Sequence, residues 1–374
     1  MRLHLLALAA VVAVAFASCK KEAWRPGAPL AKEKLKVGVL HVTDPFSNKS
    51  GYAYAHQMGI EGMGRKLGLD ESQLLYKINV YDGDSLGAES AMRELIAQGA
   101  NIIFATSYGY METCEKMAKE FPSVVFAHAT GYKHNGANFT NYFGRVYQAR
   151  YLSGIVAGLQ TETGKIGYVA AWGTESSEVS QGVNAFALGV EKVNPQAKIF
   201  VKVTHSWYDP MGEAAAARAL IAAGCDVVAQ HCDTPTPQVE AERAGVWGIG
   251  YNTDMSVEAP KAVLTSVLWD WGAYYAAMAQ SVVDGTFTAA PYYGALKDGI
   301  VAISPLSGNV KRAGQVERLV GEERRRIESG EFDVFTGVME TNDGRRIGKE
   351  GESLSDETIR NGIDWHYHNV AVVK

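Results

Sequence analysis

Short apolar runs alternate with longer stretches of helical periodicity along most of this chain. The predicted strands are 35–42, 74–81, 101–107 and 123–130, followed by 165–171, 198–207, 226–231 and 246–252. Asp209-Pro210 supplies an N-cap and a first-turn proline for one helix that Gly224 ends, and Ser85 and Gly99 bracket an earlier helix. Apolar strands between helices are typical of a parallel sheet that is covered on both faces, so we expect an α/β fold.

The order of predicted strands and helices in the first half of the chain recurs in the second half. Residues 84–103 align with 209–228, and Lys36-Val37-Gly38-Val39 matches Lys165-Ile166-Gly167-Tyr168. The same order of units in both halves predicts two similar α/β lobes, and a length of 374 residues agrees with two domains. Because ligands of open α/β sheets bind beyond the carboxyl ends of the strands, we expect both sets of strand ends to line one cleft.

The N-terminus predicts export. Arg2 precedes an apolar run from Leu5 to Ala17, which is shorter than the roughly 20 residues of a membrane span and fits a signal peptide. Phe16-Ala17-Ser18-Cys19 resembles a bacterial lipobox, in which the cysteine is lipidated; a cleaved signal with an incidental cysteine is the alternative. We expect a signal peptide (1–18), a tether (19–34) anchored through Cys19, and a location at the bacterial cell membrane, on its periplasmic side or the cell surface.

Composition and motifs exclude several classes of protein. The net charge of -5 argues against a nucleic-acid footprint. Cys114, Cys225 and Cys232 form no C-x-x-C pair, so neither a zinc site nor a redox motif is expected. Nucleophile-elbow, zinc-protease and P-loop motifs are missing from the sequence. We therefore expect a protein without a cofactor or metal that is not an enzyme.

The predicted strand ends are rich in aromatic and hydrogen-bonding residues and poor in Lys and Arg. Such groups suit a flat ligand edged with donors and acceptors, as a nucleobase is, and argue against a phosphorylated one. Two alternatives stay open, since Trp207 and Tyr208 could cap a core and His231 could be a buried, hydrogen-bonded histidine.

The stretch Tyr151-Leu152-Ser153-Gly154-Ile155-Val156-Ala157-Gly158 resembles the signature of the basic membrane protein (BMP/Med) family of lipoproteins. Supporting stretches are 126–132, 184–186, 207–210, 230–235, 250–256 and 271–275, and the resemblance covers about 35–310. It implies a type I periplasmic-binding-protein fold with three interlobe crossings, an ABC permease as partner, and a purine-type ligand between the lobes.

The resemblance also implies roles for particular residues. The loop 50–56 places an aromatic ring at Tyr52, an opposing ring comes from Trp207-Tyr208, and Asp254 binds polar atoms. Residues 44–48 do not reproduce the loop of nucleoside-binding members, which favours a free, adenine-like base over a nucleoside. The candidate ligand-binding residues are Phe46, Tyr52, Ser107, Tyr108, Trp172, Trp207, Tyr208, His231, Asp233, Asp254 and Trp271.

We expect a monomeric binding protein that closes by a hinge. The N-terminal lobe should hold 35–143 and 271–287, the C-terminal lobe 144–268 and 300–330, and an extension should follow over 331–374, with a hairpin at Asp343-Gly344. A ligand sensor of the same fold, or a binder of a sugar or another heterocycle, is the alternative, and a nucleoside hydrolase is less favoured.

Overall fold

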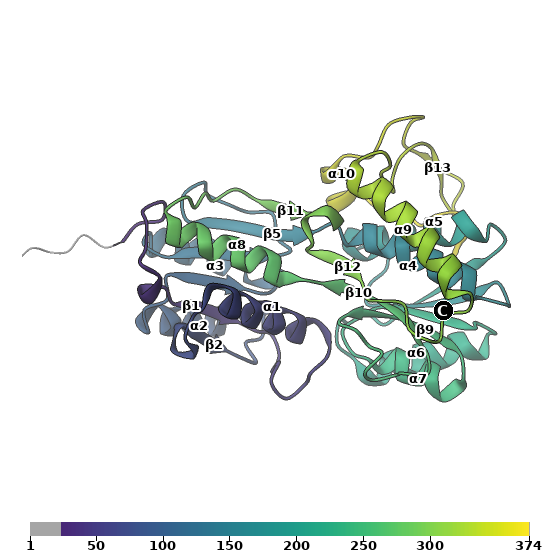
Figure 1. Ribbon diagram of the computed structural model, residues 1–374, viewed down its shortest axis with the longest axis horizontal. Coiled ribbons are helices and arrows are strands. Elements are labelled where there is room, and N and C mark those ends of the chain that lie inside the picture. The colour runs from purple at the N-terminus through teal and green to yellow at the C-terminus, as the bar shows by residue number, and fades with distance from the viewer. Residues whose placement is uncertain (1–23, 374) are drawn as a thin grey trace, which may run out of the picture.

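Two sheets, each covered by helices on both faces, form two lobes joined side by side in the computed structural model, which describes residues 24–373 (Figure 1). The two-lobed α/β fold expected from the sequence is confirmed. The expected signal peptide and Cys19 lie outside the described residues. Within that range, no helix is long and apolar enough to cross a membrane.

The N-terminal lobe is built on a six-stranded parallel sheet of order β11-β5-β4-β3-β1-β2. Successive residues of β3 point to opposite faces: Phe104 packs in the core under α1 and α8, and Ile103 packs in the core under α2 and α3. The strands are β1 (Val37–Leu40), β2 (Leu74–Lys77), β3 (Ile102–Ala105), β4 (Val125–Ala129), β5 (Phe139–Gly144) and β11 (Tyr292–Gly294). The helices are α1 (Gly51–Leu67), α2 (Ser85–Ala97), α3 (Met111–Glu120) and α8 (Trp271–Asp284), with short 3-10 turns at Lys32–Lys34, Glu71–Gln73 and Tyr108–Tyr110.

The C-terminal lobe is built on a seven-stranded sheet of order β12-β10-β9-β8-β6-β7-β15, in which only β12 is antiparallel to its neighbour. Its strands are β6 (Lys165–Ala170), β7 (Lys198–Val203), β8 (Val227–His231), β9 (Trp247–Asn252), β10 (Val263–Trp269), β12 (Val301–Ile303) and β15 (Val370–Val372). Its helices are α4 (Val146–Gln160), α5 (Ser177–Val193), α6 (Pro210–Ala222), α7 (Thr236–Ala244) and α9 (Ala313–Ser329). A core shared by both lobes runs beneath α4 and α5.

The internal repeat reappears as matched contacts. Gly38 on β1 lies against Leu95 and Ala100, so that a Cβ would sit 3.0 Å from the Leu95 side chain. Gly167 on β6 lies against Leu220 in the same way, again at 3.0 Å. A glycine at this point of each lobe lets a helix approach the sheet closely, which explains why the two halves share the pattern.

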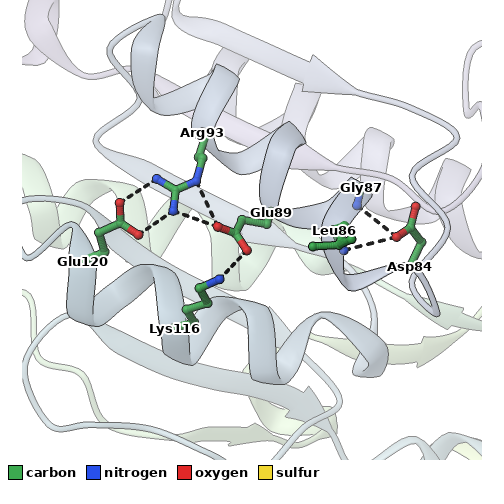
Figure 2. Close-up of polar contacts among 7 residues, drawn as sticks. All are labelled: Asp84, Leu86, Gly87, Glu89, Arg93, Lys116 and Glu120. Atoms are coloured by element: carbon green, nitrogen blue, oxygen red, sulfur yellow. Dashed lines mark hydrogen bonds and ion pairs between the residues drawn. The ribbon is translucent and has the colours of Figure 1, made fainter.

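Helices α2 and α6 begin alike. The carboxylate of Asp84 accepts hydrogen bonds from the amides of Leu86 and Gly87, as Figure 2 shows, and Asp209 accepts one from Gly212. The N-cap of α2 is therefore Asp84, one residue before the Ser85 expected from the sequence, because the longer carboxylate reaches the free amides of the first turn.

The exposed face of α2 is tied to α3 by charged side chains. Arg93 lies between Glu89 and Glu120, and Glu89 also accepts from Lys116 (Figure 2). Such surface ion pairs contribute little to stability individually. Their effect is to fix how the two helices lie against each other on one face of the sheet.

Three chain segments pass between the lobes and pack together. The first follows β5, the second runs from β10 into α8, and the third follows β11. The amide of Arg145 donates to Gly294 O over 2.7 Å, and that of Asp270 donates to Ile300 O over 2.8 Å. Gly144 lies so close to the Trp269 ring that a Cβ would come within 2.7 Å of it. These contacts form the hinge.

The strands that the sequence did not predict are mostly at the hinge or the sheet edges: β5, β10, β11, β12 and β15. Two expected strands end four residues early. β2 stops at Lys77 rather than at residue 81, and β7 stops at Val203 because His205 takes a left-handed conformation with φ 56°. The residues that follow both strands form loops on the cleft side.

The segment 331–374 adds to the C-terminal lobe. Residues Met339–Glu340 (β13) and Arg346–Ile347 (β14) form the expected hairpin around Asp343-Gly344. A short helix follows, α10 (Asp356–Asn361), which packs against α5, and β15 then pairs with β7 at the edge of the sheet. A further 3-10 turn, Leu296–Asp298, precedes β12.

Candidate functional site

A cleft of about 510 Å³ lies between the lobes, beyond the carboxyl ends of both sets of strands. This volume falls in the range of small-molecule sites. The N-terminal lobe contributes Val42, Thr43, Asn48, Ser50, Tyr52, Ala53, Tyr81, Asp82, Ser107, Tyr108 and Thr130. The C-terminal lobe contributes Trp172, Glu178, His205, Ser206, Trp207, Tyr208, Asp233 and Tyr251.

Tyr52 stands at the first turn of α1 on the N-terminal side of the cleft. Its ring packs edge-on against His56, with 4.4 Å between ring centres, and its buried hydroxyl has no hydrogen-bond partner among residues 24–373. Burial raises the pKa of this hydroxyl well above its usual value, so the group is a neutral donor. A fixed ring with an unused donor is suited to hold a ligand.

The aromatic residues of the C-terminal side follow β6 and β7. Trp172 and Trp207 are half-buried, whereas Tyr208 is 52% exposed at the rim. The Asp233 amide donates to Trp207 O over 2.8 Å, which ties the loop after β7 to the loop after β8. The loop that carries Trp207 is therefore fixed to the loop after β8, across the end of β6, which lies between β7 and β8 in the sheet.

Two carboxyl groups face the cleft from the C-terminal lobe. Burial raises the pKa of Asp233 to about 8, although its carboxylate accepts a 3.0 Å hydrogen bond from Asn252. Burial likewise raises the pKa of Glu178 to about 7, against the opposing effect of the Arg150 cation. Near neutral pH these groups carry protons for much of the time, so each can donate and accept hydrogen bonds.

A buried cation lies beneath the cleft. Arg150 on α4 is fully buried; its Nη1 donates to Gln230 O over 2.6 Å, and the guanidinium lies 4.1 Å from the centre of the Tyr251 ring. Neither ring nitrogen of the neighbouring His231 has a hydrogen-bond partner in the described part of the chain, and burial lowers its pKa well below the usual value. Arg150 is thus a positive charge that opposes the raised pKa of Glu178, and His231 stays neutral.

Three residues at or next to the cleft have a left-handed backbone conformation. Thr130 and His205, which line it, have φ angles of 69° and 56°, and Asn252, which binds Asp233, has φ 68°. Left-handed conformations cost such residues about 1–3 kcal/mol each and persist where surrounding contacts determine them. Strain of this kind is typical of functional sites.

The structure brings seven of the eleven candidate residues into the cleft: Tyr52, Ser107, Tyr108, Trp172, Trp207, Tyr208 and Asp233. Their common feature is a position just after a strand or in the first turn of a helix that starts there. Ser107 also donates to the carboxylate of Asp82, which fixes both side chains at the N-terminal rim.

The other four candidates lie elsewhere. Phe46 is exposed and packs edge-on against Tyr76 on the outer side of α1. His231 lies one layer below the cleft, 4.7 Å from Tyr251 between ring centres. Asp254 is exposed and accepts from the Ser256 amide within its own turn. Trp271 is fully buried at the hinge, stacked on His56 and Trp269, because the chain crosses between lobes there.

Several lining residues were not predicted. Glu178 lies in the first turn of α5, in the C-terminal lobe, as Tyr52 does on α1. Tyr81 and Asp82 were missed because the strand before them was expected to run through residue 81. Tyr251 lies inside β9 and His205 in a loop, where nothing local marks them.

The lobes touch at one edge of the cleft, before α1. Ser50 Oγ lies 3.4 Å from Thr253 Oγ1, and the Gly51 amide donates to the same oxygen over 3.3 Å. Gly51 has φ 81°, and a Cβ there would lie 2.2 Å from Asp233 O. Only glycine permits this approach, which closes the cleft on that side.

Two α/β lobes joined by three hinge segments, with a small-molecule cleft between them, define a solute-binding protein of the periplasmic type. No cluster of His, Cys, Asp or Glu within residues 24–373 could hold a metal ion. The chain belongs to the family of PnrA-like ABC transporter substrate-binding proteins, whose model matches residues 35–330.

Individual relatives agree with this membership. A purine-binding protein of Brucella abortus is 37% identical over 89% of this chain and 92% of its own length. A Haloferax volcanii protein that bears the name of an ABC transporter glucose-binding protein is 33% identical over 83% of this chain and 76% of its own. A solved solute-binding protein from Conexibacter woesei, 22% identical, matches 80% of this chain and 98% of its own with a TM-score of 0.67, which supports the fold.

Membership fixes the general role. The family consists of substrate-binding components of ABC transporters rather than enzymes. Such a component is exported, binds a small molecule in its cleft and meets a permease. The resemblance noted in the sequence is thereby confirmed.

Proposed function

We propose that this protein is a lipoprotein that binds a purine, with a free adenine-like base favoured over a nucleoside, and delivers it to an ABC permease by closing around it. The observation that carries the proposal is the pairing of aromatic rings from both lobes with two carboxyl groups of raised pKa in one cleft. The Brucella relative, named as a purine binder, supports the same assignment.

The rings supply affinity for a flat heterocycle. Tyr52 from the N-terminal lobe and Trp172, Trp207 and Tyr208 from the C-terminal lobe line the cleft. Each aromatic contact with a stacked ring is worth about 0.5–1.5 kcal/mol beyond the burial of area. Because the rings come from both lobes, a planar ligand gains these contacts only when the lobes close, which couples binding to closure.

The carboxyl groups select the edge of the base. A protonated carboxyl presents a donor beside an acceptor, and adenine presents an exocyclic amine beside a ring nitrogen, which is the complementary arrangement. An ionised carboxylate offers acceptors alone and suits the adjacent donors of guanine better. Burial raises the pKa of Asp233 to about 8 and that of Glu178 to about 7, so their protonated forms are available near neutral pH and favour the adenine-type edge.

Calorimetric titration with adenine, guanine, adenosine and glucose at pH 6 and pH 9 tests the proposal. We expect adenine to bind most tightly and its affinity to fall at pH 9, where the carboxyl protons are lost. The Haloferax relative makes glucose the second candidate, since aromatic rings and acidic groups also bind sugars. Binding of glucose with no purine bound would contradict the assignment while leaving the family unchanged.

The membrane anchor and the oligomeric state are part of the proposal. Cys19 stands where a lipidated cysteine would join the tether at residues 20–34. Metabolic labelling with a palmitate analogue should mark the wild-type chain and not Cys19→Ala, which should leave the membrane fraction. Labelling that survives in Cys19→Ala would contradict this anchor. Light scattering should give the mass of one chain for the detergent-solubilised protein.

A further inference from the structure

The C-terminal extension returns to the N-terminal lobe beside the hinge. Helix α10 packs against α5 of the C-terminal lobe and buries Ile359. The next residue, Arg360, faces the other way: its Nη2 donates a 3.0 Å hydrogen bond to Gly131 O, which follows β4 of the N-terminal lobe. Figure 1 shows α10 near the segment that follows β11, on the C-terminal side of the hinge.

Tyr293 in β11 contacts residues from each of these segments. The guanidinium of Arg360 lies 5.0 Å from the centre of its ring and that of Arg145 lies 4.6 Å from it. Arg145, at the first crossing, also forms an ion pair with Asp356 of α10. The Tyr293 hydroxyl lies 3.5 Å from the side-chain oxygen of Gln181 on α5. One short helix is thus linked to a hinge segment and to both lobes.

Arg360 acts on a strained turn of the ligand cleft. Gly131 directly follows Thr130, which lines the cleft with φ 69°, a conformation that β-branched residues rarely adopt. The Thr130 amide donates to Tyr142 O over 3.0 Å, and the Gly131 amide donates to Ala129 O over 2.9 Å. The hydrogen bond from Arg360 is the contact that reaches this turn from the other lobe.

We propose that the C-terminal extension is a strap between the lobes, and that Arg360 is its positioning residue, which holds the Thr130 turn in the conformation that lines the closed cleft. The strap lies outside residues 35–330, the part of the chain that the family model matches. A contact made between the lobes only when they are close favours the closed state, and its loss shifts the population toward the open one.

Hydrogen exchange of the ligand-free, full-length protein, read by mass spectrometry, tests the strap without any ligand. In Arg360→Met we expect exchange of the peptide covering 128–132 to rise about tenfold, since a charge-assisted hydrogen bond is lost. Arg360→Lys keeps a cation that can donate to Gly131 O and should restore part of the protection. Small-angle scattering should show a larger radius of gyration for Arg360→Met than for wild type.

The matched control is Arg345→Met. Arg345 belongs to the same extension, but its side chain pairs with Asp343 and Asp364 within it, so exchange at 128–132 should stay as in wild type. The peptide covering 184–191 reports whether the extension stays docked, because Asn184 and Glu191 bind it directly. Unchanged exchange at 128–132 in Arg360→Met would overturn the proposal, and so would an equal rise at 184–191. Because the exchange is measured without ligand, its outcome does not depend on whether the protein binds a purine.

Discussion

The side-chain amide of Asn252 donates a 3.0 Å hydrogen bond to the carboxyl group of Asp233, at the floor of the interlobe cleft. Asn252 reaches this position through a left-handed backbone conformation at the end of β9. The bond stabilises the ionised form of Asp233, yet burial outweighs it, so the pKa of the carboxyl stays raised to about 8. Protonation of Asp233 and folding of the protein are therefore coupled.

Asp233→Asn should flatten the pH dependence of stability of the ligand-free protein. The pKa of Asp233 is raised from 3.8 to about 8 on folding, so the folded state binds the proton more tightly than the unfolded state. Its contribution to the free energy of unfolding is present at pH 4 and is lost as the pH rises to 8. Urea unfolding at pH 5 and pH 8 should show a smaller difference in the variant than in wild type. Asp254→Asn, at an exposed turn, is the control and should keep the wild-type difference.

Tyr52→Ala should weaken purine binding by about tenfold to a hundredfold, because a ring of the cleft and a buried hydroxyl are lost together. Phe46→Ala is the matched control from the same lobe, since Phe46 packs on Tyr76 outside the cleft. Calorimetry with adenine measures both variants. An equal loss of affinity in Phe46→Ala would show that the binding site lies elsewhere.

Gly154→Ala should lower the free energy of unfolding by at least about 2 kcal/mol, because a Cβ there would lie 2.2 Å from Phe186 O on the adjacent helix. Gly321→Ala, in α9, meets only the flexible end of Arg325 at 3.8 Å and should stabilise by about 0.5–1 kcal/mol. Denaturant titration of both variants measures the pair. A neutral Gly154→Ala would show that α4 and α5 can separate without cost.

Gly51→Ala should weaken ligand binding and also lower stability, because an alanine at φ 81° is strained whether the lobes are open or closed. Its Cβ would overlap Asp233 O at 2.2 Å only when the lobes are as close as they are here, so the closed state is penalised. We expect a loss of affinity of at least about tenfold, seen mainly as faster ligand release in stopped-flow fluorescence. Gly62→Ala, in the same helix with only the Arg65 side chain at 4.0 Å, should release ligand at the wild-type rate.

The motif that led to the family has a structural role rather than a binding one. Gly154 lies in the stretch 151–158, on α4, which is buried along nearly its whole length. Its glycines, Gly154 and Gly158, allow α4 to pack closely on α5. A motif of this kind identifies the fold because packing requires it, and it carries no direct information on the ligand.

The sequence by itself determined eight of the strands, from β1 to β9 apart from β5, together with the two-fold repeat and the edge of each sheet at which the candidate ligand-binding residues gather. Local signals suffice for these features, because apolar periodicity and caps such as Asp209 depend on neighbours in the chain. The aromatic residues after the strands, Tyr108 and Trp207 among them, were found in this way.

Only the tertiary structure decided which polar groups meet. Trp271 was expected at the ligand but lies buried in the hinge. The position of the chain segment that crosses between the lobes there depends on how three distant segments pack together. The Arg150 cation acts on the pKa of Glu178, and Arg360 binds Gly131, although each pair is far apart in the chain. Burial and long-range electrostatics depend on the surroundings in space, which the order of residues along the chain does not display.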